Sequence, residues 1–431
     1  MKKRIALISC VLAAAMSLTA CGGGSTSKQD GNSTLRIAWW GGEPRHTSTI
    51  SVIDMYKAAN PGVNIETEYT SWSGYWEKLA SQMAAKNLPD VIQQDYAYLG
   101  QWMQKKQLAD LTEYTKNGTL DLSDVGENFI GGNIDGGLYG VSLGTNALAL
   151  VYNPEAYKAA GLAEPNEKYT WSQFISDAGK MKAAGFATDL LIRNDPKFMI
   201  EQMVRESGKT FYNADGTGLG FDDVKIVENA LQIQSDLVKS GTSIDKDLSY
   251  SVQNIEDSLV LSKRTWGDIT WSNQFVPVAK LTHDKGFELS LSLMPKLDTA
   301  EKTGAYLKPS MLFSVANSSE NKEEAAKFIN YFINDIEANK VLAGERGVPV
   351  SSKVRETLKE TLPDYEKKVY DYIDLVGEVG SPIDRPEPSG SGEVSSVLKT
   401  IFEEIVRETK TPADGAAEFM KTANEILAKN K

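Results

Sequence analysis

Residues 34–69 read TLRIAWWGGEPRHTSTISVIDMYKAANPGVNIETEY, and this stretch decides the fold class. Its first seven residues carry the β-branched and aromatic side chains typical of a strand, and a glycine pair ends the run. Ile50, Ile53 and Tyr56 then recur at helical spacing until an Asn-Pro-Gly turn. The segment VNIETEY that follows predicts a second strand. A strand, a helix and a strand in succession indicate one unit of an α/β sheet.

The same alternation continues along the chain. Residues 73–87 predict a helix, residues 89–95 a strand and residues 97–111 another helix. Strands that alternate with helices indicate an α/β fold with crossover connections. In open sheets of this kind, ligands bind beyond the carboxyl ends of the strands. We therefore expect the residues just after each predicted strand to lie near a binding site.

The N-terminal residues have the pattern of a targeting segment. A basic start precedes an apolar stretch, which ends in Leu-Thr-Ala-Cys at residues 18–21. We interpret residues 1–20 as a lipoprotein signal peptide, because Cys21 stands where a lipobox places the cysteine that receives lipid. An ordinary signal peptide with a chance cysteine fits less well, since the residues on both sides of Cys21 match. Residues 21–34 are expected to form a flexible tether that anchors the protein to the outer face of the cell membrane.

Charge and cysteine content limit the possible partners and the source of stability. The chain has 431 residues and a net charge of −12, which loss of the basic signal start makes more negative. Such acidity argues against nucleic acid as a partner. The only cysteine besides Cys21 is Cys10, which leaves with the signal. Without an internal disulfide, stability must come from apolar cores in two or more domains.

Four separated stretches resemble one family of proteins. In chain order they are YKAANPGVNIE from Tyr56, LASQMAAKNLPDVIQ from Leu79, GGLYGVSLGTNALALVYNPEAYKAAGL from Gly136, and SMLFSVANSSENKEEAAKFINYF from Ser310. Together they resemble the extracellular solute-binding lipoproteins of carbohydrate ABC importers (family 1, maltodextrin-binding-like). The stretches LRIAWWGGEPRH and GERGVPVS further resemble Bacillus-type lipoproteins associated with uptake of pectin fragments, notably type I rhamnogalacturonan oligosaccharides.

The resemblance implies a periplasmic-binding-protein fold, with two α/β lobes, a hinge and a ligand cleft between the lobes. By the same resemblance, residues 35–145 with 312–345 form lobe one, and residues 146–311 with 346–431 form lobe two. It implies a receptor that captures an oligosaccharide and delivers it to ABC permease subunits driven by a cytoplasmic ATPase. We expect a monomer without cofactor.

Aromatic residues near the predicted strand ends are candidates for sugar binding. Sugar rings offer apolar C–H faces and a rim of hydroxyls, so a sugar site needs flat aromatic and planar polar side chains. Trp39 and Trp40 should point to opposite faces of the first strand, and we expect Trp40 to meet the ligand. Trp72 is a second candidate. In a segment where the family often carries a stacking aromatic, Trp271 is favoured over Trp266.

Polar candidates accompany these aromatic residues. Asp95 and Tyr96 follow the predicted strand at residues 89–95, Asn146 lies at the expected lobe crossing, and Asn273 is close to Trp271 in sequence. Their side chains suit the hydroxyls of a sugar. Structural roles are open as well, because Asp95 also fits the N-cap of a helix and Asn146 a turn.

Three basic residues suggest an acidic sugar. Arg45, His46 and Arg346 are predicted near the cleft, and arginine pairs carboxylates in a fork geometry that neutral sugars do not require. An oligosaccharide that bears uronic acid fits this set. The alternatives are a solvated pair of Arg45 with Glu43 and a structural pair of Arg346 with Glu345, in which case a neutral oligosaccharide fits as well.

An enzymatic reading has weaker support. Residues 140–144 match the G-x-S-x-G nucleophile elbow, which needs a following helix, whereas a strand-like run follows here. The only histidines are His46 and His283, and the latter reads as part of a surface loop. A glycosidase pair such as Glu43 and Asp95 stays open. The mature chain has no Cys/His metal cluster, so we predict a binding protein without metal.

Overall fold

The computed structural model describes residues 33–189, 196–252 and 257–430. The predicted signal peptide and Cys21, together with most of the predicted tether, lie outside the described residues. Within the described ranges, none of the helices combines the length and the apolar character that a membrane span requires.

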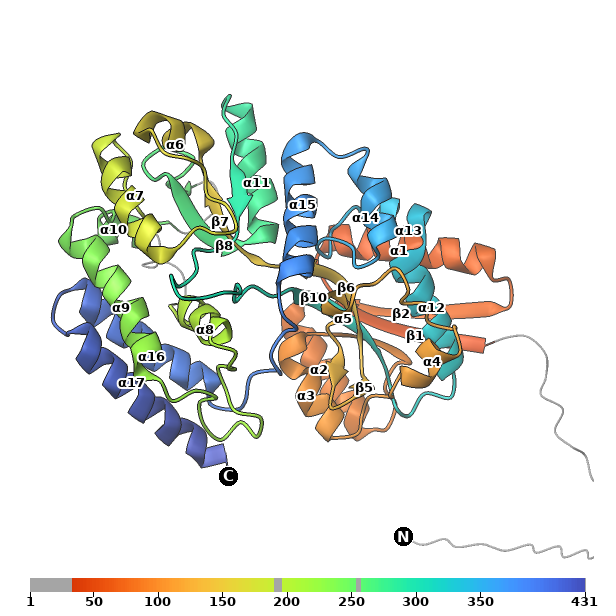
Figure 1. The fold of residues 1–431 in the computed structure, drawn as a ribbon. Coiled ribbons are helices and arrows are strands. Elements are labelled where there is room, and N and C mark those ends of the chain that lie inside the picture. The colour runs from red at the N-terminus through yellow and green to blue at the C-terminus, as the bar shows by residue number, and fades with distance from the viewer. Residues whose placement is uncertain (1–32, 190–195, 253–256, 431) are drawn as a thin grey trace, which may run out of the picture.

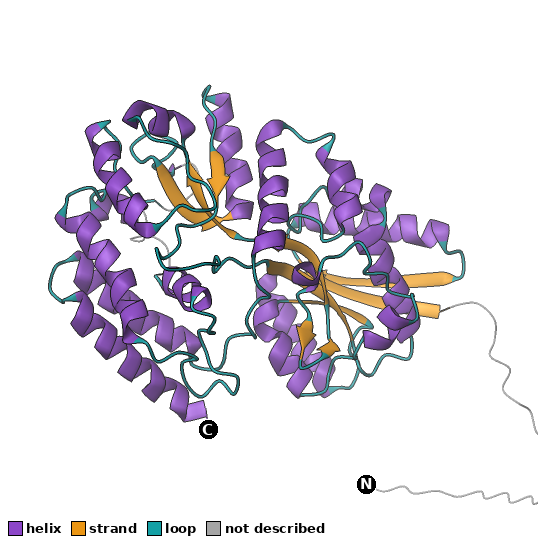
Figure 2. Ribbon diagram, viewed as in Figure 1, coloured by secondary structure: helices purple, strands orange, loops and turns teal. Residues whose placement is uncertain are grey.

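Two lobes lie side by side, and each is built around its own sheet (Figures 1 and 2). The sheet of the first lobe has the strand order β2-β1-β3-β10-β6. β1 pairs in parallel with β2 and β3, whereas β10 is antiparallel to both β3 and β6. The predicted α/β fold class is confirmed. The bounds are β1 (Ser33–Trp40), β2 (Val63–Thr70), β3 (Val91–Gln94), β6 (Val141–Asn146) and β10 (Lys308–Val315).

The helix after β1 begins earlier than the sequence predicted. α1 spans Glu43–Ala59, so it begins seven residues before Ile50, the first apolar position of the predicted helical pattern. Pro44 is well tolerated in this first turn, because its missing N–H would have no helical partner there. Glu43 also favours this position, because a carboxylate interacts well with a helix N-terminus. Arg45 and His46 therefore project from a helix rather than a loop.

The second lobe contains a three-stranded antiparallel sheet in the order β8-β7-β9. The strands are β7 (Leu148–Tyr152), β8 (Gly267–Trp271) and β9 (Ser290–Ser292). The strand-like run that the sequence showed across residues 138–153 is therefore divided between two sheets, and the chain crosses from one lobe to the other at Ala147, after β6. A small ribbon in the first lobe pairs β4 (Asn133–Ile134) with β5 (Gly137–Leu138).

Helices surround both sheets. Those in the first core cluster or packed against it include α1, α2 (Trp72–Ala84), α3 (Tyr96–Gln104), α4 (Thr112–Lys116), α5 (Glu127–Ile130), α12 (Lys322–Asn334), α13 (Ile336–Leu342), α14 (Ser352–Lys359) and α15 (Asp364–Val379), which also contacts β9 of the second sheet. The remaining helices are α6 (Pro154–Ala160), α7 (Trp171–Ala183), α8 (Lys197–Glu206), α9 (Val224–Lys239), α10 (Lys246–Tyr250), α11 (Ser272–Asp284), α16 (Ser391–Val406), α17 (Pro412–Leu427) and a final 3-10 turn (Ala428–Asn430). α11 packs against α15 where the lobes meet (Figure 1).

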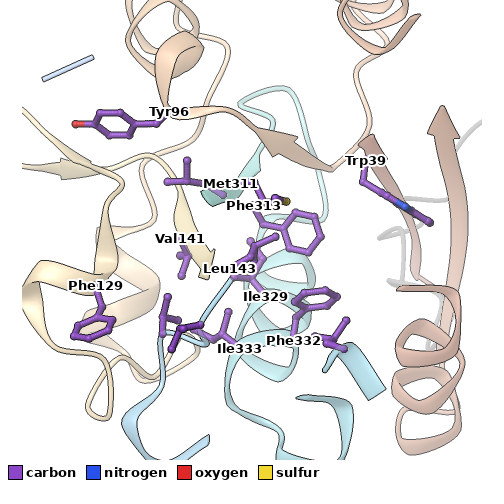
Figure 3. Close-up of a cluster of buried hydrophobic side chains, with 14 of the residues drawn as sticks. Trp39, Tyr96, Phe129, Val141, Leu143, Met311, Phe313, Ile329, Phe332 and Ile333 are labelled. Carbon is purple, nitrogen blue, oxygen red and sulfur yellow. The ribbon is translucent and has the colours of Figure 1, made fainter. Parts of the chain in front are cut away.

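The buried apolar side chains form two clusters, and the first extends across the lobe boundary to include residues of β7 and α11. Figure 3 shows part of the first, where Phe313 of β10 packs on Phe332 of α12, with ring centroids 4.9 Å apart. Residues of α14 and α15 belong to this first cluster, whereas α16 and α17 belong to the second. The lobe boundary expected at residue 346 stays a prediction, because the first cluster also holds residues of both sheets. An amphipathic helix pattern does not say which sheet will cover the helix.

Among the described residues, three segments connect the lobes, and Arg205 of α8 bonds to two of these segments. The buried Arg205 donates from Nε to the carbonyl of Gly304, 3.0 Å away, just before β10. Its Nη2 donates to the carbonyl of Pro382 (2.8 Å) in the segment between α15 and α16, where it also pairs with Asp384. One guanidinium therefore holds two of the segments that connect the lobes together.

Candidate functional site

Two adjoining cavities lie where the lobes meet. The first has a volume of about 600 Å³ and the second about 430 Å³. The first is lined by residues of α1, β10 and α15 from one lobe and of α11 from the other, and the second by residues of α3 and α8. Asp95, Trp271 and Lys308 line both cavities, so they form the boundary between them.

Trp271 ends β8 and projects into this boundary. Phe198 packs edge-on against its ring, with centroids 5.6 Å apart, and Tyr306 lies 6.3 Å away. The ammonium of Lys308 sits over the indole, 4.9 Å from its centroid. Lys308 is exposed and forms no ion pair with any described residue. A flat ring and an unpaired cation therefore stand together at the centre of the cleft, as a charged sugar would require.

Arg346 lies against the first cavity and is only 3% exposed. Its Nε donates to Gln93 Oε1 at 3.2 Å and its Nη2 to Thr49 Oγ1 at 2.8 Å. Nη1 has no hydrogen-bond partner among the described residues, although Glu345 Oε2 is 3.7 Å away. Burial, assisted by the charge of Arg45, lowers the pKa of Arg346 to about 9, so the guanidinium stays charged at neutral pH. The donor group at Nη1 has almost no accessible surface, so a ligand in the cavity could reach it only if neighbouring groups moved.

Arg45 also lines the first cavity, but its guanidinium is engaged. Its Nε lies 2.9 and 2.8 Å from the two carboxylate oxygens of Glu345. Its Nη1 donates to the carbonyl of Trp40 at 3.3 Å. The structural alternative weighed for Arg45 named Glu43, and the actual partner is Glu345, 300 residues away in the chain.

Asp95 and Tyr96 lie at the predicted strand end and also have structural roles. Asp95 caps α3, where its Oδ1 accepts from Ala97 N at 2.9 Å, and it also lines both cavities. Tyr96 lines the second cavity, and its hydroxyl donates to the carbonyl of Asp384 at 2.6 Å. Burial raises the pKa of Tyr96 well above its usual value, so the hydroxyl stays protonated. Both residues therefore line the cleft, and Tyr96 also bonds to the segment between α15 and α16.

Asn146 and Asn273 both line the first cavity. Asn146 is the last residue of β6, at the lobe crossing, and Asn273 is exposed in the first turn of α11. The two amides face one cavity from different lobes.

The two N-terminal tryptophan candidates differ in exposure. Trp40 is 7% exposed and packs under Trp72, with ring centroids 5.0 Å apart, and it lines neither cavity. Trp72 is 44% exposed at the start of α2. Trp72 also neighbours Tyr98, which lines the second cavity, at 6.3 Å. Of this pair, Trp72 is the one whose surface a ligand can reach.

His46 lies away from both cavities. Its Nδ1 accepts a hydrogen bond from the indole of Trp39 at 3.1 Å, and its ring packs on Tyr69 with centroids 4.5 Å apart. The structure therefore places it in an aromatic group on the outer part of β1 and β2 rather than in the cleft.

Several cavity residues were not predicted from the sequence. They are Lys308, Phe198, Glu201, Tyr306, Glu366 and Tyr370. Lys308 begins a strand and Glu201 belongs to an amphipathic helix, so neither follows a predicted strand end. No motif marks them, because the cavity forms only when both lobes are assembled.

The nucleophile-like motif is structural. Ser142 is fully buried in β6, and its hydroxyl donates to the carbonyl of Gly144 at 2.8 Å. β7 follows instead of a helix, and His283 pairs with Glu288 on the surface, at 2.7 Å. Glu43, the proposed partner of Asp95 in a glycosidase pair, lines neither cavity. The described ranges also contain no group of His, Cys, Asp and Glu residues that could hold a metal ion.

Known proteins share this architecture. The structure of an extracellular solute-binding protein family 1 member from Alicyclobacillus acidocaldarius is 26% identical with a TM-score of 0.82, and covers 93% of this chain and 100% of its own. A periplasmic oligogalacturonide binding protein from Yersinia enterocolitica is 20% identical with a TM-score of 0.78, over 92% and 100% of the two chains. At the latter identity, the likeness concerns the fold alone.

Curated relatives match shorter segments. The lactose-binding protein of Rhizobium radiobacter is 25% identical over 217 residues, which is 50% of each chain. A putative binding protein of Brucella abortus is 27% identical over 131 residues, 30% of this chain and 31% of the relative. The chain thus spans half or less of the length of these curated relatives.

A family model provides the decisive match. The model of the bacterial extracellular solute-binding proteins aligns with residues 51–368, most of the described chain. This chain therefore belongs to the family of bacterial extracellular solute-binding proteins.

Proposed function

We propose that this chain is the extracellular substrate-binding component of an ABC importer, and that it captures plant cell-wall oligosaccharides, in particular type I rhamnogalacturonan fragments. The observation that carries the proposal is the pairing of Trp271 with an unpaired Lys308 at the boundary of two interlobe cavities. The ring offers a stacking face for a sugar, and the ammonium offers a partner for a carboxylate on that sugar.

Arg346 adds a second positive charge beside the first cavity. Its Nη1 is buried, lacks a hydrogen bond among the described residues and lies 3.7 Å from Glu345 Oε2. A uronate carboxylate in this cavity would pair with Lys308, whereas a neutral sugar would leave that ammonium without a counter-ion among the described residues. Trp72, Asp95, Tyr96, Asn146 and Asn273 are proposed to complete the ligand contacts from the surrounding walls.

One structurally similar protein supports an acidic sugar. The Yersinia enterocolitica oligogalacturonide binding protein has also been solved in complex with saturated digalacturonic acid, and that structure has a TM-score of 0.69 to this chain. The stretches around Trp40 and Arg346 resemble proteins associated with uptake of pectin fragments.

A neutral oligosaccharide is the second candidate ligand. The pairing of Arg45 with Glu345 favours it, because this cation needs no ligand carboxylate. One relative, from Rhizobium radiobacter, is named a lactose-binding protein.

We also propose that the protein acts as a monomer that is lipid-anchored through Cys21 on the outer face of the membrane, where it meets the permease subunits. Cys21→Ser should release the protein from the membrane fraction and abolish incorporation of labelled palmitate. Retention of the variant in the membrane would contradict the anchor.

Calorimetric titration of a chain that starts at Gly22 tests the ligand class. The panel contains rhamnogalacturonan, galacturonan, galactan and xylan oligosaccharides. Saturable binding that favours rhamnogalacturonan is expected. Binding of neutral chains only would support the second candidate ligand, a neutral oligosaccharide, instead. Binding of none of the oligosaccharides would refute the proposal.

A further inference from the structure

We propose that the second cavity accepts an uncharged sugar and rejects a second uronate, and that Glu201 sets this preference. The inference rests on the proposed function, because it assumes that an acidic sugar occupies the first cavity. It makes Glu201 a specificity-determining residue for chains in which acidic and neutral sugars alternate.

Glu201 is the carboxylate of the second cavity that lacks a partner. It lines the cavity from α8, three residues after Phe198 and therefore on the same helix face. Its side chain forms no hydrogen bond or ion pair with any described residue. Burial raises the pKa of its carboxyl group, even though Lys197 and Arg205 are close enough to oppose the shift.

The neighbouring cations cannot offset this charge for a ligand, because each is already paired. Lys197 pairs with Glu387, and Arg205 with Asp384. Arg385, which lines the same cavity, pairs with Asp135. Lys308 stands at the boundary, where the first cavity already uses it. A second ligand carboxylate would therefore meet a carboxylate without a compensating cation, and like charges in a poorly hydrated site repel strongly.

The remaining lining of the second cavity suits an uncharged sugar with an apolar side. Tyr98, Phe198, Trp271 and Tyr306 contribute aromatic rings from four different segments. The face of Tyr306 is covered by the guanidinium of Arg205, 4.6 Å from the ring centroid, which holds this ring in place. Aromatic rings pack well on the C–H face and the methyl group of a 6-deoxyhexose.

The two cavities therefore differ in what they can accept. The first has the positive charge of Arg346 beside it, and the second has an unpaired carboxylate among aromatic rings. A uronate followed by a 6-deoxyhexose matches this order, whereas two adjacent uronates do not. The boundary at Trp271 lets neighbouring sugars of one chain occupy both cavities.

The test compares Glu201→Gln with the wild type by calorimetric titration of trigalacturonate and of a rhamnogalacturonan tetrasaccharide. Glu201→Gln should tighten trigalacturonate binding about tenfold and change rhamnogalacturonan binding less than about twofold. Glu366→Gln is the matched control, because Glu366 lines only the first cavity. This control should change the affinities for both ligands by the same factor and therefore leave their ratio unchanged.

A second measurement needs no variant. Digalacturonate has two carboxylates and can therefore form two isomers of its monomethyl ester. One of these two esters should bind the wild type more tightly than free digalacturonate does. An unchanged affinity ratio in Glu201→Gln, or a ratio that Glu366→Gln shifts equally, would overturn the inference while leaving the receptor for acidic sugars intact. Failure of the wild type to bind either acidic oligosaccharide would instead refute the proposed function, and the inference with it.

Discussion

The charge of Lys308 is held in place by an aromatic ring rather than by a carboxylate. Its ammonium lies 4.9 Å from the centroid of Trp271, and cation–π attraction of this kind positions a cation without neutralising it. A ligand carboxylate that approaches the ring can then form an ion pair without displacing an existing one. This arrangement couples recognition of ring shape to recognition of charge.

Lys308→Met should weaken binding of uronate-bearing oligosaccharides about tenfold, because one charge-assisted contact is lost. Binding of a neutral oligosaccharide should change little. Trp271→Ala should weaken both ligand classes, since the stacking face disappears. Calorimetric titration measures all three affinities.

Lys280→Met is the matched control for these variants. Lys280 is exposed on α11 and lines neither cavity. If Lys280→Met weakened acidic ligands as much as Lys308→Met, the effect would come from overall charge and not from a contact at Trp271.

Single residues also show where inference from the sequence stops. Alternation along β1 predicted that one of Trp39 and Trp40 would face a ligand, yet both are buried. β1 pairs with β2 and β3 on its two sides and is covered by helices, so both of its faces are interior. Trp271 lines both cavities, and it was favoured over Trp266 by the family resemblance rather than by a local signal. Lys308 and Glu201 carry no local signal either.

At the scale of elements, α8 carries a buried carboxyl group that links stability to pH. Burial raises the pKa of Glu206 from 4.5 to about 7, even though Leu297 N and Gln202 Nε2 donate to its carboxylate. Between these two pH values, the folded chain keeps a proton that the unfolded chain releases. The contribution of Glu206 to the free energy of unfolding should therefore fall as pH rises through this window, by at most about 3 kcal/mol.

Urea unfolding of the wild type and Glu206→Gln at pH 4.5, 6 and 8 tests this link. The wild type should lose more stability than the variant between the lowest and highest pH. Parallel pH profiles for the two proteins would assign the pH dependence to other groups.

Elements were the level at which sequence analysis succeeded most. Patterning predicted the strands of residues 34–40, 63–69 and 89–95, because their apolar side chains alternate with polar ones or stand together as in Val91-Ile92. Patterning alone did not separate β6 from β7, whereas the family resemblance placed a lobe crossing at Asn146, the last residue of β6. Patterning also did not assign α14 and α15 to a lobe, because a buried face does not identify its partner.

For the whole molecule, membership of a solute-binding family confirms the prediction that the chain is a binding protein and not an enzyme. With cavities at the lobe boundary, ligand binding should close the lobes by a hinge motion. Small-angle X-ray scattering should show a smaller radius of gyration with saturating ligand than without it. Binding without any decrease would indicate a rigid cleft.

Arg205 is expected to stabilise the hinge, since it bonds the segments at Gly304 and Pro382 together. Arg205→Lys keeps the charge beside Asp384 but loses the fork, so the free energy of unfolding should decrease by about 2–4 kcal/mol. Denaturant unfolding measures the decrease. Arg407→Lys, at an exposed position after α16, is the control and should cost almost nothing.

The position of β10 determines the order in which the protein can be assembled. β10 lies between β3 and β6, and β6 has its sheet contact through β10. The sheet of the first lobe is therefore incomplete until Val315 has joined it, after the whole of β7, β8 and β9. Contacts between such distant parts of a chain slow folding. A nascent or translocating chain would thus expose the open edge of β3 for a long time, which makes this edge the segment most in need of chaperone protection.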